Sequence, residues 1–264
     1  MNIPHPSILS ARPLRRLAVL LLALMLIAAL LPAASAQESP LGKDEEFAQE
    51  EENGDPFEGF NRAMFDFNLF LDDLIGKPLA EIYRNVLPEP VRDSFQNFMR
   101  NLRTPVILVN DLLQGEGERA NETTTRFLIN TTLGVGGLFD VAFDMGLTYH
   151  SEDFGQTLAV HGVGEGPYLV LPILGPSNFR DAAGKAVDSF LHPLTYLAYV
   201  DGYEIWTYGL RGTEVVDVRS RNIETIDQLQ ADALDFYSLI RSVYLQHRQS
   251  EIRNGRPEND STKP

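Results

Sequence analysis

Apolar residues recur at helical spacing over most of the chain beyond residue 54. In "DPFEGFNRAMFDFNLFLDDLIGKP", residues 55–78, large side chains return every three or four positions, which places them on one face of a helix. Asp55 is a candidate N-cap, and Gly76 and Pro78 are expected to end the helix. The apolar face consists of Phe57, Phe60, Met64, Phe67, Phe70, Leu71 and Leu74.

The next segments also carry the sequence signals of helix starts and ends. "LPEPVRDSFQNFMRNLRTP" and "TPVILVNDLLQGEG" predict two helices that separate at Pro105, with Thr104 as the cap of the second and Gly115 as its end. "ERANETTTRFLINTTLG" predicts a weaker helix that ends near Gly134. A short apolar segment, "GGLFDVAFDMG", comes next.

The middle of the chain has a different pattern. Glu152 to Asp181 is rich in glycine and proline and is predicted to be a loop region, with one extended piece at Tyr168 to Leu171. Ser177 is the expected cap of a helix over Phe179 to Leu191, and two or three helices run from Thr213 to about Arg248. The chain is therefore predicted to be mainly α with few or no strands. Short helices broken by Gly and Pro suit a ring-like arrangement at least as well as a straight bundle.

The first 54 residues divide into two segments. Positive residues at Arg12, Arg15 and Arg16, the apolar run Leu17 to Leu31 and the small residues Ala34-Ser35-Ala36 predict a signal peptide over 1–36. An uncleaved anchor is the alternative, but the apolar run is shorter than the roughly 20 residues that a span needs. An acidic, disordered spacer over 37–54, a helical domain over 55–248 and a polar tail over 249–264 are expected to follow.

Composition and motifs point away from several classes of function. The net charge of −15 argues against a nucleic-acid partner. The sequence contains neither an HExxH zinc motif nor a G-x-S-x-G nucleophile elbow, and "GVGEGP" lacks the Lys-Ser/Thr of a phosphate loop. Ser177 is better explained as a cap than as a nucleophile, and Glu152-Asp153 as capping or loop residues than as an acid pair. We therefore expect no enzyme activity, no metal and no cofactor.

The phenylalanine-rich face of residues 55–78 packs either on other helices or against lipid. Such a face is more often part of a core. Its aromatic and aliphatic composition is also typical of helices in a membrane interface, although these usually carry a basic polar face. Here Asp66, Asp72 and Asp73 are acidic. That charge argues against adsorption to anionic lipid and is compatible with deeper embedding or with a protein partner.

Several motifs in the same order resemble the MlaA/VacJ family of phospholipid-transport proteins. They are "DPFEGFNRAMFDFN", "KPLAEIYRNVLPEPVRDSFQNFMRNLRTP", "NDLLQGE", "RFLINTTLGVGGLFDVA", "EDFGQTLAVHGVGEGPYLVLPILGPSNFRD" and "DSFLHPLTYL". The resemblance implies a ring of helices embedded in the periplasmic leaflet of the outer membrane, with an amphipathic channel. It implies a non-enzymatic channel that removes mislocalised phospholipid from the outer leaflet and passes it to a soluble periplasmic carrier. Family members associate with trimeric porins.

The resemblance also assigns roles to residues. The phenylalanine-rich face would contact lipid. Gly134, Gly136 and Gly137 are candidates for a hinge near the channel, and the other interpretation is a helix end followed by a tight turn. The polar residues that either bound the channel or support it structurally are Glu152, Asp153, Arg180 and Asp181.

One departure from the family concerns the membrane anchor. Many members carry an acylated cysteine directly after the signal, whereas Gln37 follows Ala36 here and the sequence contains no cysteine. We therefore expect an outer-membrane protein of the periplasmic leaflet that is exported by a cleaved signal and is not lipidated. The alternative function is a periplasmic scaffold that docks on a porin without moving lipid. A lipid-cleaving enzyme is the third hypothesis.

Overall fold

The computed structural model describes residues 55–198 and 203–256. The chain divides after Glu52, and all described residues belong to the second unit, Asn53–Pro264. The expected signal peptide and acidic spacer lie outside the described residues, as do residues 257–264 of the expected tail.

The second unit is mainly helical, which confirms the predicted fold class. A small antiparallel sheet of two strands pairs Tyr168 with Asn178 and Leu171 with Gly175. The elements in chain order are α3 (Glu58–Leu71), the π-helical turn η1 (Asp72–Gly76), α4 (Lys77–Val86), α5 (Glu89–Leu113), α6 (Gly117–Thr132), α7 (Val141–Asp144), α8 (Phe154–Val160), β1 (Tyr168–Leu171), β2 (Gly175–Asn178), α9 (Phe179–Leu191), α10 (Pro193–Leu197), α11 (Glu204–Arg221), α12 (Ile223–Asp232) and α13 (Phe236–Ile252).

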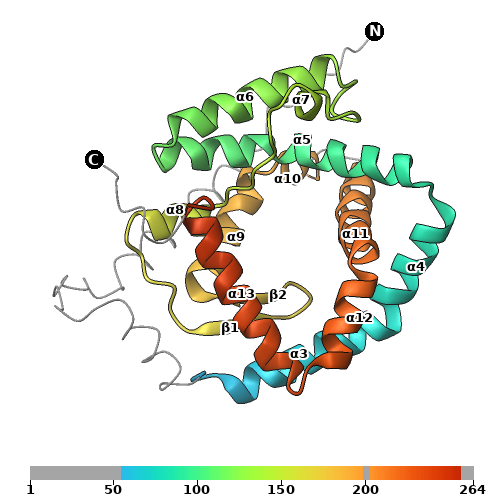
Figure 1. Cartoon of the computed structure of the whole chain (residues 1–264), viewed down its shortest axis with the longest axis vertical. Helices are drawn as coiled ribbons and strands as arrows, with labels where there is room; N and C mark the ends of the chain where they lie inside the picture. The colour runs from blue at the N-terminus through green and yellow to red at the C-terminus, as the bar shows by residue number, and fades with distance from the viewer. Residues whose placement is uncertain (1–54, 199–202, 257–264) are drawn as a thin grey trace, which may run out of the picture. The chain divides into compact units, whose positions relative to one another are not determined.

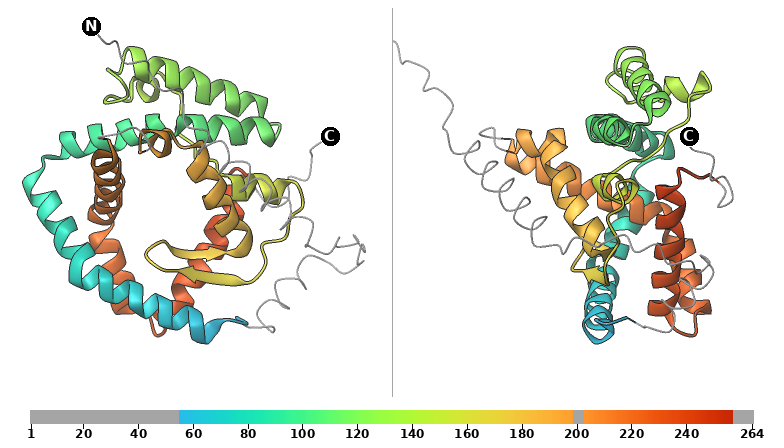
Figure 2. Two further views of the ribbon diagram at one scale, coloured as in Figure 1. Left: turned by 180° about the vertical axis from the view of Figure 1, so that it is seen from behind. Right: turned by 90° about the vertical axis from the view of Figure 1, so that its left-hand side faces the viewer.

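Taken by itself, the second unit follows a ring-like course (Figure 1). Helices α3, α4 and α5 form one side of this course, and α8, α9 and the β-hairpin form the other. The view from behind shows the same course (Figure 2). Contacts between neighbours hold it together: α4 packs on α11, α5 on α6, α8 on α9, and α3 on β1. The predicted ring-like arrangement of short helices is therefore observed.

The first helix does not end where the sequence predicts. It continues through η1 into α4, and Pro78 comes just after the π-helical turn, where the Lys77 N–H bonds five residues back to Asp72 and the regular hydrogen-bond pattern is already interrupted. Gly76 is helical and has another role. A Cβ there would lie 2.5 Å from Oδ1 of Asp72, whose carboxylate accepts hydrogen bonds from Nε and Nη2 of Arg219 at 2.9 Å each. Gly76 thus leaves room for the Asp72–Arg219 ion pair instead of stopping the helix.

Pro105 does not separate two helices either. It lies inside α5, so the prediction of a break with Thr104 as a new N-cap is wrong. The Thr104 hydroxyl donates instead to the Arg100 carbonyl at 3.4 Å. Directly after the proline, Val106 and Ile107 are buried, and their packing keeps the helix continuous despite the lost backbone hydrogen bond. The predicted helix end at Gly115 is confirmed, since α5 stops at Leu113.

The middle segment is more ordered than the prediction of a loop. The extended piece at Tyr168–Leu171 is strand β1, as expected, but helix α8 and strand β2 were missed. The predicted cap of α9 is wrong by one residue. The side chain of Asn178 accepts a hydrogen bond from the Asp181 N–H at 2.7 Å, while Ser177 is buried in β2.

Two asparagines of α3 hold the free edge of β1. Asn61 donates to the Tyr168 carbonyl at 3.0 Å and accepts from the Val170 N–H at 2.8 Å. Asn68 makes the same pair of contacts further along the hairpin: it donates to the Leu171 carbonyl at 3.0 Å and accepts from the Ile173 N–H at 2.7 Å. The side-chain amides therefore serve as backbone partners for this edge.

The apolar core next to this edge is small. It consists of Phe65, Tyr168, Val170 and Tyr237, with ring centroids 5.6 Å apart between Phe65 and Tyr237. Fully burying each such side chain is worth about 1.5–3 kcal/mol. Among the described residues, buried polar and charged side chains outnumber buried hydrophobic ones, so polar networks take over much of the role of a core. No helix in the described ranges has the length and hydrophobicity that a membrane span requires.

Candidate functional site

The phenylalanine-rich face of the first helix is exposed. Phe60 has 50% of its surface accessible and Phe70 has 60%, while Phe65 turns the other way into the core. Phe57, Phe67 and Leu74 are exposed as well, and Met64 and Leu71 are half-buried. The residues predicted to face lipid thus lie on a surface that is largely uncovered by the described residues.

This surface extends beyond the predicted residues. The large apolar side chains exposed on α4 and η1 continue it, although the sequence predicts a lipid-facing surface for the first helix alone. The signal that could have found them is the helical spacing of Leu79 and Ile82 among polar residues in "KPLAEIYRNV". We define the apolar surface as the exposed large apolar side chains of residues 57–86, which are Phe57, Phe60, Phe67, Phe70, Leu74, Ile75, Leu79, Ile82 and Val86.

A cavity of about 520 Å³ lies among α5, α11 and α13. Its walls combine apolar and charged side chains, and none of the predicted site residues lines it. We call it the charged cavity; its lining residues are Phe95, Gln96, Met99, Arg100, Arg103, Tyr149, Ser151, Glu214, Asp217, Val218 and His247. The signal in the sequence was two arginines three residues apart within the otherwise apolar face of Phe95 and Met99.

Charges of both signs line this cavity. The guanidinium of Arg100 lies over the Tyr149 ring, 4.8 Å from its centroid. Asp217 is held in place by the Tyr83 hydroxyl at 3.0 Å and by Nε of Arg221 at 2.9 Å. Burial raises the pKa of Glu214, against the opposing effect of the nearby Arg103 charge. The cavity therefore offers a polar environment inside a unit that exposes many large apolar side chains.

The predicted hinge glycines form a tight turn after α6. Gly136 and Gly137 have φ angles of 71° and 92°, which favour glycine. A Cβ on Gly134 would lie 2.2 Å from the Phe139 carbonyl oxygen. The N–H of Gly137 donates to the Asn130 carbonyl at 2.8 Å and closes the helix end. These contacts fit a helix end with a tight turn, and motion about a hinge stays a prediction.

A compact polar cluster holds this turn in place. The Asp140 carboxylate accepts from Nη2 of Arg126 at 2.8 and 2.9 Å and from Nδ2 of Asn130 at 2.8 Å. Burial raises the pKa of Asp140, but these hydrogen bonds outweigh it and hold the pKa below its usual range. Asn130 also accepts from the Ala142 N–H at 2.9 Å.

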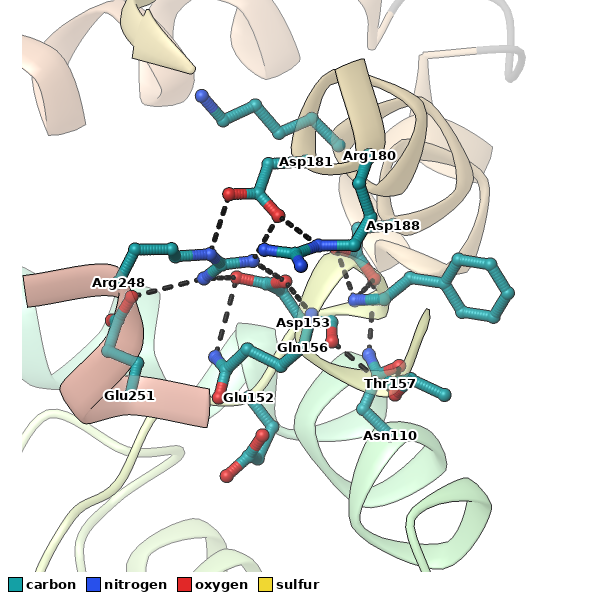
Figure 3. A network of polar contacts seen from close by, with 12 residues as sticks. Asn110, Glu152, Asp153, Gln156, Thr157, Arg180, Asp181, Asp188, Arg248 and Glu251 are labelled. Atoms are coloured by element: carbon teal, nitrogen blue, oxygen red, sulfur yellow. Dashed lines mark hydrogen bonds and ion pairs between the residues drawn. The ribbon is translucent and has the colours of Figure 1, made fainter. Parts of the chain in front are cut away.

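Three of the four predicted polar residues, Asp153, Arg180 and Asp181, meet in a buried network, and Glu152 lies beside it (Figure 3). At its centre is Arg248 of α13, which donates to Asp153 at 2.6 and 2.7 Å and to Asp181 at 2.7 and 3.0 Å. Asp153 caps α8 by accepting from the Gln156 N–H, so the interpretation of Asp153 as a capping residue is confirmed. The Arg248 hydrogen bonds hold the pKa values of both aspartates below their usual range, although burial acts in the opposite direction.

The remaining two predicted residues differ in their surroundings. Arg180 donates from Nε to Asp181 at 3.1 Å, whereas Glu152 accepts from Gln114 at 2.8 Å and from Arg119 at 2.7 Å, outside the Arg248 network. These contacts are those of a structural support: the Arg248 network ties α8, α9 and α13 together, and Glu152 bonds to the C-cap residue of α5 and to α6. Sequence reasoning missed Arg248 because nothing in its local pattern distinguishes it from an exposed helical arginine.

Two glycines bring α8 and α9 into backbone contact beside this network. A Cβ on Gly184 would lie 2.4 Å from the Gly155 nitrogen and 2.8 Å from its Cα. A Cβ on Gly155 would lie 2.6 Å from both Arg248 Nη2 and Asp181 Oδ1. The close packing of these helices therefore positions the ion pairs. No group of three or more His, Cys, Asp or Glu residues within the described ranges is placed to hold a metal ion.

Asp188, at the edge of this network, predicts a pH dependence of stability. Its carboxylate accepts from the Phe154 N–H at 3.0 Å and from Asn110 at 3.1 Å, and burial raises its pKa to about 6. Between pH 3.8 and 6 the folded protein therefore binds more protons than the unfolded chain, and stability falls as the pH rises. In Asp188→Asn this contribution is absent. We expect the unfolding free energy of the wild type, minus that of the variant, to fall by about 2 kcal/mol from pH 4 to pH 6.5.

Urea unfolding of both proteins at several pH values measures this difference, in which all other titrating groups cancel. Curves that stay parallel over this range would show that Asp188 titrates normally in the folded state.

Comparison with known proteins places the chain in a family. A sequence model of the family described as MlaA lipoprotein matches residues 53–251. The chain belongs to the MlaA family. The intermembrane phospholipid transport system lipoprotein MlaA of Escherichia coli (strain K12) is 37% identical over 205 residues, which cover 76% of this chain and 79% of that protein. An uncharacterised protein of Rickettsia prowazekii (strain Madrid E) is 39% identical over 206 residues, which cover 78% of this chain and 80% of that protein.

A solved structure shares the MlaA fold seen here. The work is described as "Structural basis for maintenance of bacterial outer membrane lipid asymmetry". That chain is 36% identical, and the TM-score is 0.67 over 75% of this chain and 99% of that chain. The resemblance deduced from the sequence motifs is therefore confirmed, as is the mainly helical fold.

The same comparisons correct the expected localisation. The absence of cysteine led to the prediction of a protein that is not lipidated. The MlaA family is described as a lipoprotein family, and the MlaA proteins of Escherichia coli and Haemophilus influenzae are named lipoproteins. The prediction conflicts with these names and is wrong on this finding, because it gave one missing residue type more weight than the family to which the chain belongs.

Proposed function

We propose that the protein is a phospholipid translocation channel. It takes mislocalised phospholipid from the outer leaflet of the outer membrane and passes it to a soluble periplasmic carrier. The transport role is supported by the relative named for intermembrane phospholipid transport and by the solved structure described for outer membrane lipid asymmetry. The observation that carries the channel mechanism is the charged cavity within a unit that exposes large apolar side chains.

The arrangement matches the two halves of a phospholipid. Moving a charged headgroup through hydrocarbon is costly unless polar groups replace its water. The charged cavity supplies such groups, while the acyl chains stay in contact with lipid or with apolar side chains. The apolar surface then sits in one leaflet of the membrane, where its phenylalanines are buried by lipid.

This mechanism needs no bond to form or break and no cofactor. Net flow follows from a carrier that binds phospholipid more tightly than the channel does. We propose that the protein lies next to an outer-membrane porin trimer, in the same membrane into which its apolar surface inserts. The phospholipid should therefore be recovered chemically unchanged after passage. Release of free fatty acid would instead point to an enzyme.

Surface phospholipid of living cells tests the proposed function. A probe that reaches only the cell surface should detect more phospholipid in the outer leaflet when the gene is deleted, and the intact gene should reverse the rise. Unchanged surface phospholipid would contradict the proposal and favour the scaffold that docks on a porin. In that case membrane retention should depend on the porin.

Vesicle binding tests the role of the apolar surface. Replacing Phe60, Phe67 and Phe70 with serine removes three side chains whose burial is worth about 1.5–3 kcal/mol each. We expect at least a tenfold loss of binding of the full chain to phospholipid vesicles, measured by flotation, with an unchanged far-ultraviolet circular dichroism spectrum.

The matched control is a double variant of the same helical segment, Asp66→Ser with Asp73→Ser, because both aspartates are exposed and outside the apolar surface. It should bind vesicles at least as well as the wild type. Equal binding by the phenylalanine variant would show that this surface faces something other than lipid.

A further inference from the structure

The charged cavity holds side chains of both signs that form no ion pair with the described part of the chain. Neither Arg100 nor Arg103 forms an ion pair with a carboxylate of the described residues, and Glu214 makes no hydrogen bond or ion pair there. Many other arginines of the unit are paired with carboxylates. Arg219, for example, contacts two carboxylates and Arg248 contacts three. The charges of the cavity are therefore available to a ligand.

The two arginines suit a phosphodiester. They lie three residues apart on α5 and line the same cavity, so their guanidinium groups lie on one face of the helix. Guanidinium groups bind phosphate oxygens in bidentate fashion. Arg100 lies over the Tyr149 ring, 4.8 Å from its centroid, and within the described residues its guanidinium forms no ion pair with a carboxylate, so its N–H groups are open to a phosphate.

The glutamate suits a cation close to that phosphate. Glu214 lies on α11 and lines the same cavity, and Asp217 one turn further on is already occupied by Tyr83 and Arg221. Glu214 is thus the carboxylate of the cavity that remains open to a ligand. A volume of about 520 Å³ falls within the roughly 300–1,000 Å³ of typical ligand sites.

We propose that the charged cavity is a headgroup site selective for phospholipids that carry a primary amine, with Arg100 and Arg103 binding the phosphodiester and Glu214 binding the ammonium group. This inference rests on the proposed function and adds a preference for phosphatidylethanolamine over phosphatidylglycerol. An ammonium group brings a positive charge and N–H donors to Glu214, whereas the glycerol headgroup offers only neutral hydroxyls beside an unpaired carboxylate.

Competition between two lipids tests the selectivity. The full chain is purified from mixed micelles that contain equal amounts of phosphatidylethanolamine and phosphatidylglycerol, and the bound phospholipids are quantified by mass spectrometry. We expect the wild type to be enriched in phosphatidylethanolamine, and Glu214→Gln to reduce the ratio roughly tenfold while keeping its total bound phospholipid. Arg100→Gln with Arg103→Gln should reduce binding of both lipids.

Controls separate this site from general effects. Glu118→Gln removes an exposed carboxylate outside the cavity and should leave the ratio unchanged. Equal ratios in the wild type and Glu214→Gln would overturn the inference alone, whereas a wild type without bound phospholipid would overturn the proposed function with it. Inorganic phosphate added in millimolar amounts should not displace the lipid. Displacement would identify a free-phosphate site instead and overturn the headgroup assignment.

Discussion

Replacing Arg248 with leucine is expected to lower the free energy of unfolding by about 3–5 kcal/mol, which is the cost of leaving buried charges unpaired. The guanidinium contacts two carboxylates on different helices, those of Asp153 and Asp181, at 2.6–3.0 Å, and Glu251 of its own helix at 3.0 Å. Asp153 and Asp181 are both ionised in the folded state because these hydrogen bonds lower their pKa values. Without the arginine, two negative charges remain close together between α8 and α9. Denaturant unfolding in detergent measures the loss.

The matched control is Arg62→Leu. Arg62 also contacts two carboxylates, those of Glu58 and Asp235, at 2.7 and 2.6 Å, but this cluster is exposed to solvent. Water screens such pairs, so we expect only a small change in stability. Similar losses in both variants would show that burial of the Arg248 network does not determine its contribution.

Replacing Gly184 with alanine is expected to destabilise the fold by about 2–3 kcal/mol through overpacking. The new methyl group would lie 2.4 Å from the backbone nitrogen of Gly155, and a backbone atom cannot rotate away as a flexible side chain can. Helices α8 and α9 must therefore move apart, which also disturbs the carboxylates that Arg248 binds. Thermal or denaturant unfolding measures the effect.

Gly209→Ala is the control for this substitution. Gly209 is a helical glycine of α11, and a methyl group added there would meet nothing within 4 Å among the described residues. Alanine there should raise the free energy of unfolding by about 0.5–1 kcal/mol, because it restricts the unfolded chain and favours the helix. If Gly184→Ala were equally favourable, the close contact of the two helices would be absent in solution.

Local sequence signals predicted elements where the cause of the structure is local. The bounds of α9 match the predicted helix Phe179 to Leu191, and β1 matches the predicted extended piece. Predictions failed where distant packing overrides a local preference. Pro105 is accommodated inside α5 by buried neighbours, and Gly76 makes room for an ion pair with Arg219, a residue far along the chain.

The candidate site was even less predictable from local patterns. Arg248 is 95 residues from Asp153 and 67 from Asp181, so their meeting follows only from the fold. The charged cavity likewise combines side chains of α5, α11 and α13. The family motifs made the fold and the transport class predictable, but they did not identify the residues that line the cavity.

The two asparagines of α3 have a consequence for how the protein behaves among copies of itself. A two-stranded hairpin alone is marginally stable, and its open edge is a template to which a strand of another molecule can add. Asn61 and Asn68 occupy three backbone groups of β1 and the Ile173 N–H just beyond it. The hairpin is therefore closed to strand addition on this side, which protects a protein with so much exposed apolar surface from one common route to aggregation.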